Sequence, residues 1–144
     1  MKFLLIPRTI RSFCGKMKDK VLFDSSIWIE IERKNPAILN RAIPLIQKNQ
    51  VVLADVIMAE VLRGCKTEKD FKKLHAAFLD FTNLSASWEE VAWLAFQLRL
   101  KGFLPPLIDC YIALCATRYG KILVTEDKHF LSIQKLINLK LEYW

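Results

Sequence analysis

The sequence has few of the residues on which several kinds of site depend. Its only histidines are His75 and His129, and none of its four cysteines are paired in a C-x-x-C motif. Neither the histidines nor the cysteines predict a zinc site. The histidines are expected to have surface or packing roles, and the cysteines to be buried free thiols of a protein in a reducing compartment. No apolar run approaches the roughly 20 residues that cross a bilayer. The short apolar start, interrupted at Pro7, is not an export signal. We therefore expect a soluble, cytoplasmic protein with no membrane association.

The 144 residues, 53% of them hydrophobic, fit one compact core. Residues 1–19 show no clear period and include five basic side chains, so they are predicted to be a basic N-terminal extension outside the fold, with Met17 as an alternative start. The folded domain is then residues 20–144. The net charge of +7 suits a polyanionic partner.

Short apolar runs alternate with helical patterns from residue 20 onward. The runs at 21–23, 51–54 and 122–125 predict buried strands, with a weaker final strand at 139–143. Helices are predicted after each of the first two strands, over 67–81, from Ser87 to Gly102, and from Asp109 to about Tyr119. This alternation predicts an α/β fold with a parallel sheet covered by helices on both faces.

Some side chains have more specific predicted places. Ser87 and Glu90 have the spacing of a capping box. Trp28, Trp88 and Trp93 are expected in the core, and Trp144 at an interface. The predicted helix over 67–81 carries a basic face, which suits either phosphate contact or plain solvation. The lysines of this face are Lys69, Lys72 and Lys73, together with Lys66 just before the helix.

Four acidic residues stand at the ends of predicted elements: Asp24, Glu60, Asp109 and Asp127. Asp24 and Asp127 follow strands whose carboxyl ends meet at one edge of a parallel sheet, and the other two lie on helices that reach the same crevice. Ionised carboxylates beside a core need a partner. An all-carboxylate set without clustered histidines favours Mg²⁺ or Mn²⁺ and phosphate chemistry.

Each carboxylate also has an ordinary interpretation. Asp24 suits a helix cap, Glu60 a solvated helix residue, Asp109 a partner of the helix dipole and Asp127 a turn residue. An aspartyl-phosphate phosphatase fits poorly, because Ser26 stands where that class has a second aspartate. A phosphorylated receiver domain fits less well too, since it needs an acidic pair near the first strand.

Four segments together resemble the PIN domain family, and most closely its VapC-type ribonuclease toxins. They are Val-Leu-Phe-Asp-Ser-Ser-Ile-Trp-Ile (21–29), Ala-Glu-Val-Leu-Arg-Gly (59–64), Asp-Cys-Tyr-Ile-Ala (109–113) and Thr-Glu-Asp-Lys-His-Phe (125–130). The resemblance covers nearly all of residues 20–144. It implies a three-layer PIN-like α/β fold with a central, mainly parallel sheet flanked by helices. It also implies a metal-dependent endoribonuclease, a homodimer, and inhibition by a cognate small antitoxin protein.

The resemblance places Asp24, Glu60, Asp109 and Asp127 as the catalytic and metal-binding quartet, with Ser26 as a supporting residue; strand alternation adds Thr125 as a second one. Between the neighbouring acids Glu126 and Asp127, the alternation of an extended chain favours Asp127, whose side chain shares a side with Thr125. Arg63 and Lys66 are candidate RNA contacts. The alternative function is a non-catalytic PIN-like module for RNA binding or assembly.

Overall fold

The computed structural model describes residues 20–144, so the predicted extension and the alternative start at Met17 lie outside the described residues. Within them, five strands form one sheet in the order β3-β2-β1-β4-β5, and all four pairings are parallel. The strands are β1 (Val21–Phe23), β2 (Val51–Ala54), β3 (Asn83–Leu84), β4 (Ile122–Thr125) and β5 (Lys140–Tyr143). The predicted parallel sheet is confirmed, and β3 is a short strand that the sequence did not predict.

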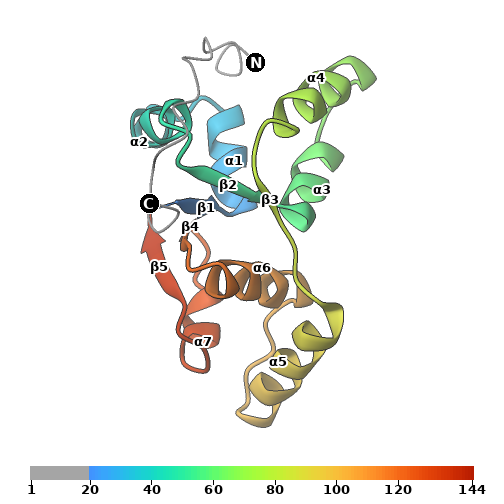
Figure 1. Ribbon diagram of the computed structural model, residues 1–144, viewed down its shortest axis with the longest axis vertical. Coiled ribbons are helices and arrows are strands. Elements are labelled where there is room, and N and C mark those ends of the chain that lie inside the picture. The colour runs from blue at the N-terminus through green and yellow to red at the C-terminus, as the bar shows by residue number, and fades with distance from the viewer. Residues whose placement is uncertain (1–19) are drawn as a thin grey trace.

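Seven helices connect these strands within the described residues: α1 (Ser25–Glu32), α2 (Pro36–Gln47), α3 (Asp55–Arg63), α4 (Glu68–Phe78), α5 (Trp88–Leu100), α6 (Leu107–Arg118) and α7 (Phe130–Gln134). Helices α1 to α4 lie on one side of the sheet and α5 to α7 on the other, so the predicted three-layer α/β fold is confirmed (Figure 1). No helix among residues 20–144 combines the length and apolar character needed to cross a bilayer.

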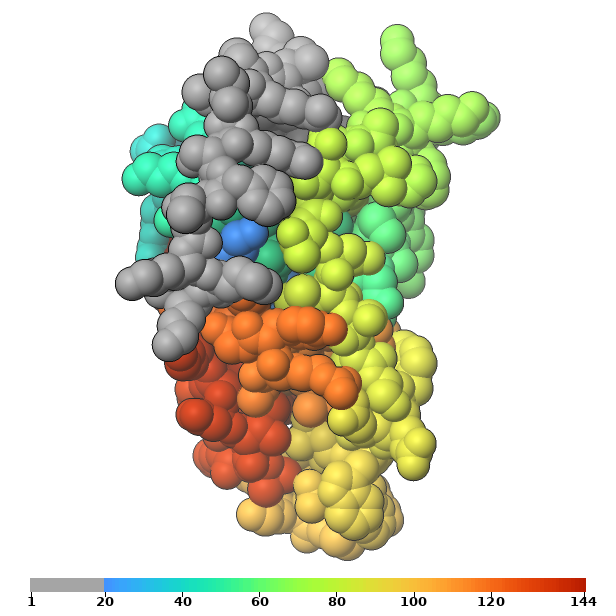
Figure 2. Space-filling view, in the orientation of Figure 1, coloured from blue at the N-terminus to red at the C-terminus, as the bar shows by residue number. Residues whose placement is uncertain are grey.

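The strand order explains why the helices divide in this way. From β1 the chain moves outward to β2 and β3, then returns to place β4 on the other side of β1 and continues to β5. Because crossovers between parallel strands are right-handed, the connections that lead from β1 to β3 lie on one face of the sheet, and those that lead from β3 to β4 and β5 lie on the other. The segment from α4 to α5, which includes β3, runs along one margin of the molecule and joins the two helical layers (Figures 1 and 2). The order therefore reverses between β1 and β4, where ligand sites of such sheets form.

The core is built on the three central strands. Every residue of β1 and β2 is buried, as expected of parallel strands covered on both faces. Trp28 is 1% exposed, and its ring meets the rings of Phe23, Phe78 and Phe81 edge-on. The expected core position of Trp28 is confirmed.

Two other tryptophans are not in the core, contrary to expectation. Trp88 and Trp93 are 53% and 61% exposed. Helix α5 buries a different stripe, Val91, Leu94 and Leu98, and the tryptophans fall outside it. Trp144 is half-buried and packs its ring against Phe23 and the Arg41 guanidinium of its own chain.

Several helix ends also differ from the predictions. Ser87 makes no side-chain capping hydrogen bond, and Glu90 instead accepts one from Arg118 (2.7 Å), so the predicted capping box is wrong. Helix α6 begins at Leu107, after Pro106, which leaves Asp109 within its first turn rather than at its start. Cys110 and Cys115 are buried free thiols, as expected, whereas the free thiol of Cys65 is only partly buried.

Candidate active site

Asp24 leaves β1 at its carboxyl end, where its backbone N–H donates to the Val124 carbonyl on β4 (2.9 Å). Its side chain makes no capping hydrogen bond to α1. Instead, Oδ2 accepts hydrogen bonds from Thr125 Oγ1 (2.8 Å) and Ser26 Oγ (3.1 Å). Asp24 is only 4% exposed, and this burial raises the pKa of its carboxyl group although the hydrogen bonds act in the opposite direction. Asp24 therefore occupies the N-cap position of α1, as its ordinary interpretation has it, but its side chain does not cap the helix.

Thr125 and Ser26 form a small hydroxyl network behind Asp24. Thr125 ends β4 and is fully buried. Its Oγ1 also accepts the backbone N–H of Asp127 (2.9 Å). The Ser26 hydroxyl lies 3.4 Å from Thr125 Oγ1 and accepts the N–H of Glu126 (3.2 Å). The two hydroxyls thus join the end of β1 to the turn after β4.

Asp109 and Asp127 face each other beside Asp24. The dipole at the start of α6 favours a carboxylate at Asp109. Burial first, and then the charges of Asp127 and Asp24, nevertheless raise the pKa of this carboxyl group to about 6, although His129 acts to lower it. The Nδ1 atom of His129 lies 3.3 Å from Oδ2 of Asp109 and 3.3 Å from Oδ1 of Asp127. The mutual effects of these charges on pKa show that Asp24, Asp109 and Asp127, three of the four predicted carboxylates, lie in one cluster.

Glu60 belongs to the same cluster through helix α3. Burial raises its pKa, the Ser25 hydroxyl lowers it by hydrogen bonding, and the charge of Asp24 raises it again. The basic side chain of Arg63, one turn later on α3, has only a small opposing effect. The structure therefore brings all four predicted acidic residues to one edge of the sheet.

This donor set fits a hard divalent cation. Among the described residues, Oε2 of Glu60 and Oδ2 of Asp109 are buried without a well-directed hydrogen bond. Buried carboxylate oxygens without a hydrogen bond, in a group of like charges that raise one another's pKa values, are stabilised by a bound cation. Mg²⁺ and Mn²⁺ prefer such oxygen ligands, so Asp24, Glu60, Asp109 and Asp127 could hold one.

The two predicted RNA contacts follow Glu60 closely in the sequence, and both lie on the surface. Arg63 occupies the last turn of α3, the helix that carries Glu60, and Lys66 follows in the connection to α4. Both side chains are exposed. The lysines of α4, Lys69, Lys72 and Lys73, are exposed as well, and Lys72 pairs with Glu68.

Sequence reasoning missed two features of the region. His129 was expected to have a surface or packing role, yet it contacts two site carboxylates; its position two residues after Asp127 was the available signal. Asp55 is the first residue of α3 and accepts a hydrogen bond from the Tyr111 hydroxyl (3.0 Å). No sequence pattern indicated that pairing, because the residues lie 56 positions apart.

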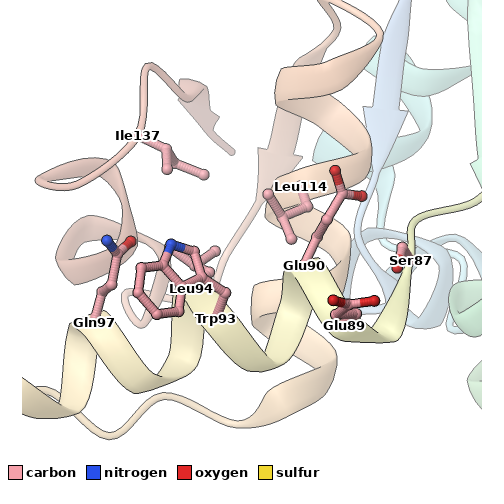
Figure 3. A pocket seen from close by; sticks show the side chains of 8 residues that line it. All are labelled: Ser87, Glu89, Glu90, Trp93, Leu94, Gln97, Leu114 and Ile137. Carbon is pink, nitrogen blue, oxygen red and sulfur yellow. The ribbon is translucent and has the colours of Figure 1, made fainter.

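A separate hollow of about 420 Å³ lies along α5. Figure 3 shows Trp93, Leu94 and Gln97 of α5 on one side, with Leu114 of α6 and Ile137 opposite. None of the four clustered carboxylates lines it. The hollow is therefore distinct from the candidate active site.

Comparisons with known proteins agree with the fold. A chain in the crystal structure of VapBC2 from Rickettsia felis bound to a DNA fragment from their promoter is similar, with 25% identity and a TM-score of 0.67 over 86% of this chain and 98% of that one. A chain in the DNA-bound VapBC structure from Salmonella typhimurium has 17% identity and a TM-score of 0.69 (87% and 98% covered). A toxin-antitoxin complex from Klebsiella pneumoniae has 22% identity and a TM-score of 0.62 (77% and 90% covered). The last two likenesses show the fold alone.

No curated protein sequence matches the chain significantly. The model of the PIN domain family, however, matches residues 21–136. That span runs from β1 through α7 and includes all four clustered carboxylates and the hydroxyls that support Asp24. The match, the parallel sheet and the acidic cluster agree, and the chain belongs to the PIN domain family.

Proposed function

We propose that the chain is a metal-dependent endoribonuclease that hydrolyses RNA phosphodiester bonds, and that it is the VapC-type toxin of a type II toxin-antitoxin pair. The observation that carries the catalytic part is the convergence of four acidic residues at one edge of the sheet. Oε2 of Glu60 is buried without a hydrogen bond, and Oδ2 of Asp109 is buried with Nδ1 of His129 3.3 Å away. His129 reaches Asp109 and Asp127 from an exposed position.

The residues have different parts in this proposal. Asp24, Asp109 and Asp127 would hold the Mg²⁺ or Mn²⁺, and Glu60 would bind it directly or through water. Thr125 and Ser26 orient Oδ2 of Asp24. A bound cation lowers the pKa of a coordinated water and stabilises negative charge that develops on the phosphate. Attack by water leaves a 5′-phosphate and a 3′-hydroxyl, and no side-chain nucleophile is needed.

RNA binding is proposed for exposed basic side chains at and after the end of α3. Arg63 and Lys66 are exposed at the end of the helix that carries Glu60. Their charges attract phosphates, and the net charge of +7 favours a polyanion overall. These features support an RNA substrate and do not select a particular RNA.

The proposed partner is a small antitoxin. The similar chain of Rickettsia felis comes from a structure titled VapBC2, which supports a two-protein system here. An antitoxin arginine would pair with the acidic cluster through bidentate hydrogen bonds and exclude the cation or the RNA. We also propose a homodimer that acts in the cytoplasm.

The alternative is a non-catalytic PIN-like module that binds RNA or assembles with other proteins. A cleavage assay with purified, partner-free protein separates the two functions. We expect single-stranded RNA to be cut in Mg²⁺ or Mn²⁺, and to stay intact in excess EDTA. Mapping the new ends should find 5′-phosphates.

Matched controls make the assay decisive. Asp24→Asn should lose cleavage, whereas Glu68→Gln, which changes an exposed carboxylate on α4, should keep it. RNA that is bound but never cut would favour the non-catalytic module. Equal cutting with and without EDTA would contradict the metal mechanism. Toxin function is tested separately: expression should slow growth, and co-expression of the neighbouring small protein should relieve it.

A further inference from the structure

We propose that His129 is a further ligand of the cation at the candidate active site, and that its imidazole makes the site prefer Mn²⁺ to Mg²⁺. This inference rests on the proposed function, because it concerns the same cation. It adds a nitrogen donor to what the sequence presented as an all-oxygen site.

The geometry places three donors together. One ligand atom each from Asp109, Asp127 and His129 lies within 4.8 Å of the other two. The Nδ1 atom of His129 is 3.3 Å from an oxygen of each carboxylate. Adjacent donors around a six-coordinate ion with bonds of about 2.1 Å are separated by about 3 Å, so the three atoms are already close to that arrangement.

The backbone holds the histidine in this position. Its N–H donates to Oδ1 of Asp127 (2.9 Å), and its carbonyl accepts a hydrogen bond from Ser132 Oγ (2.9 Å). The next residue, Phe130, is fully buried and anchors α7 in the core. The imidazole itself is 60% exposed, so an ion arriving from solvent can reach it.

The chemistry of the donors then decides between the two cations. Mg²⁺ is bound by oxygen and keeps several water ligands. Carboxylate and water ligands serve both ions. Mn²⁺ is the softer of the two, as a transition-metal ion, and accepts an imidazole nitrogen more readily than Mg²⁺ does. The added nitrogen ligand of a site with several carboxylates therefore increases the affinity for Mn²⁺ more than the affinity for Mg²⁺. The other interpretation is that His129 only pairs with Asp109 and Asp127, or contacts an RNA phosphate.

Pulsed electron paramagnetic resonance of bound Mn²⁺ tests the direct bond. The experiment uses the full chain without an affinity tag, and compares wild type, His129→Gln and His75→Gln. His75 is a matched control because it is the only other histidine, lies on α4 and does not belong to the cluster. We expect the ¹⁴N modulation of a coordinated imidazole in wild type and His75→Gln, and its loss in His129→Gln.

Calorimetric titration tests the selectivity without any cleavage assay. His129→Gln should weaken Mn²⁺ binding about 10-fold to 100-fold and Mg²⁺ binding less than about 3-fold. Thermal melting of the metal-free variant checks that it is folded. Equal losses for the two ions, or ¹⁴N modulation that persists in His129→Gln, would overturn the inference.

The outcomes also separate this inference from the proposed function. Mn²⁺ that binds the wild type without ¹⁴N modulation, while EDTA still abolishes RNA cleavage, would overturn the role of His129 and leave the nuclease in place. A wild-type protein that binds neither ion would overturn both.

Discussion

The hydroxyl of Thr125 donates a hydrogen bond of 2.8 Å to Oδ2 of Asp24, a residue 101 positions earlier in the chain. The same hydroxyl accepts the backbone N–H of Asp127 (2.9 Å). One buried oxygen therefore links the carboxylate at the end of β1 to the turn that carries another carboxylate. The position of each acid depends on this side chain.

Thr125→Val removes that link while keeping the shape of the side chain. The buried carboxylate of Asp24 loses a donor and the N–H of Asp127 loses an acceptor, so we expect the free energy of unfolding to fall by about 1–3 kcal/mol. Mn²⁺ affinity should fall about 10-fold or more, because residues that orient ligands contribute that much. Urea denaturation in EDTA and Mn²⁺ titration measure the two effects. Thr125→Ser is the control; if Thr125→Val matches it in both measurements, the hydroxyl does not orient the site.

Asp109→Asn tests whether the carboxylates converge on a cation. It removes a charge that repels Asp127 and Asp24, so the metal-free variant should be at least as stable as wild type. The rise in melting temperature caused by Mn²⁺ should shrink to less than half, since that rise follows from binding, and RNA cleavage should be lost. Glu68→Gln should leave the Mn²⁺ response unchanged. A full Mn²⁺ shift together with full cleavage in Asp109→Asn would remove Asp109 from the site.

The raised pKa of Asp109 predicts a pH dependence in EDTA. Its pKa moves from 3.8 to about 6 in the folded protein, so between those values the folded state binds more protons than the unfolded state. The contribution of Asp109 to stability therefore falls as the pH rises from 4 to 6, by at most about 3 kcal/mol. The free energy of unfolding of Asp109→Asn minus that of wild type should grow over this window. A constant difference from pH 4 to 7 would contradict the prediction.

Tyr111→Phe should weaken the fold without affecting the metal. The Tyr111 hydroxyl accepts the N–H of Ala86 and donates to Asp55 Oδ2, both at 3.0 Å, so its loss should cost about 1–3 kcal/mol of unfolding free energy. Tyr119→Phe is the control, because Tyr119 is 43% exposed. Chemical denaturation measures the cost. An altered Mn²⁺ response in Tyr111→Phe would show that this network reaches the candidate active site.

Neutralising Arg63 and Lys66 should weaken RNA binding more than cation binding. For single-stranded RNA, each lost phosphate contact reduces the slope of log affinity against log salt concentration by about 0.7. Binding of a non-hydrolysed RNA to Arg63→Gln and Lys66→Gln, measured at several salt concentrations, tests this. Lys101→Gln, beyond the end of α5, is the charge-matched control. A slope equal to that of Lys101→Gln would exclude the tested residue as a phosphate contact.

The sequence predicted the central strands well because their signals are local. Val21–Phe23, Val51–Ala54 and Ile122–Thr125 are apolar runs that the fold buries almost completely. Strand β3 has two residues and exists through its pairing with β2, so it has no local signal. The exposed tryptophans of α5 were misplaced because that helix is apolar on several sides, and its packing selects only one of them.

The sequence allowed the acidic residues of the site to be identified, but not the contacts that their side chains make. Asp24 and Asp127 follow strands, so their position at one edge of a parallel sheet could be inferred from order alone. The hydrogen bond between Thr125 and Asp24, and the approach of His129 to two carboxylates, depend on side-chain positions across distant segments. Periodicity and spacing carry no information about such contacts.

The place of β4 has a consequence for synthesis of the protein. This strand comes late in the sequence yet inserts beside β1, the first strand of the described residues. While a ribosome is still making the earlier part, Asp24 has neither the hydroxyl of Thr125 nor the carboxylate of Asp127 beside it. A nascent chain therefore cannot assemble the four-carboxylate cluster until β4 and the turn after it have emerged.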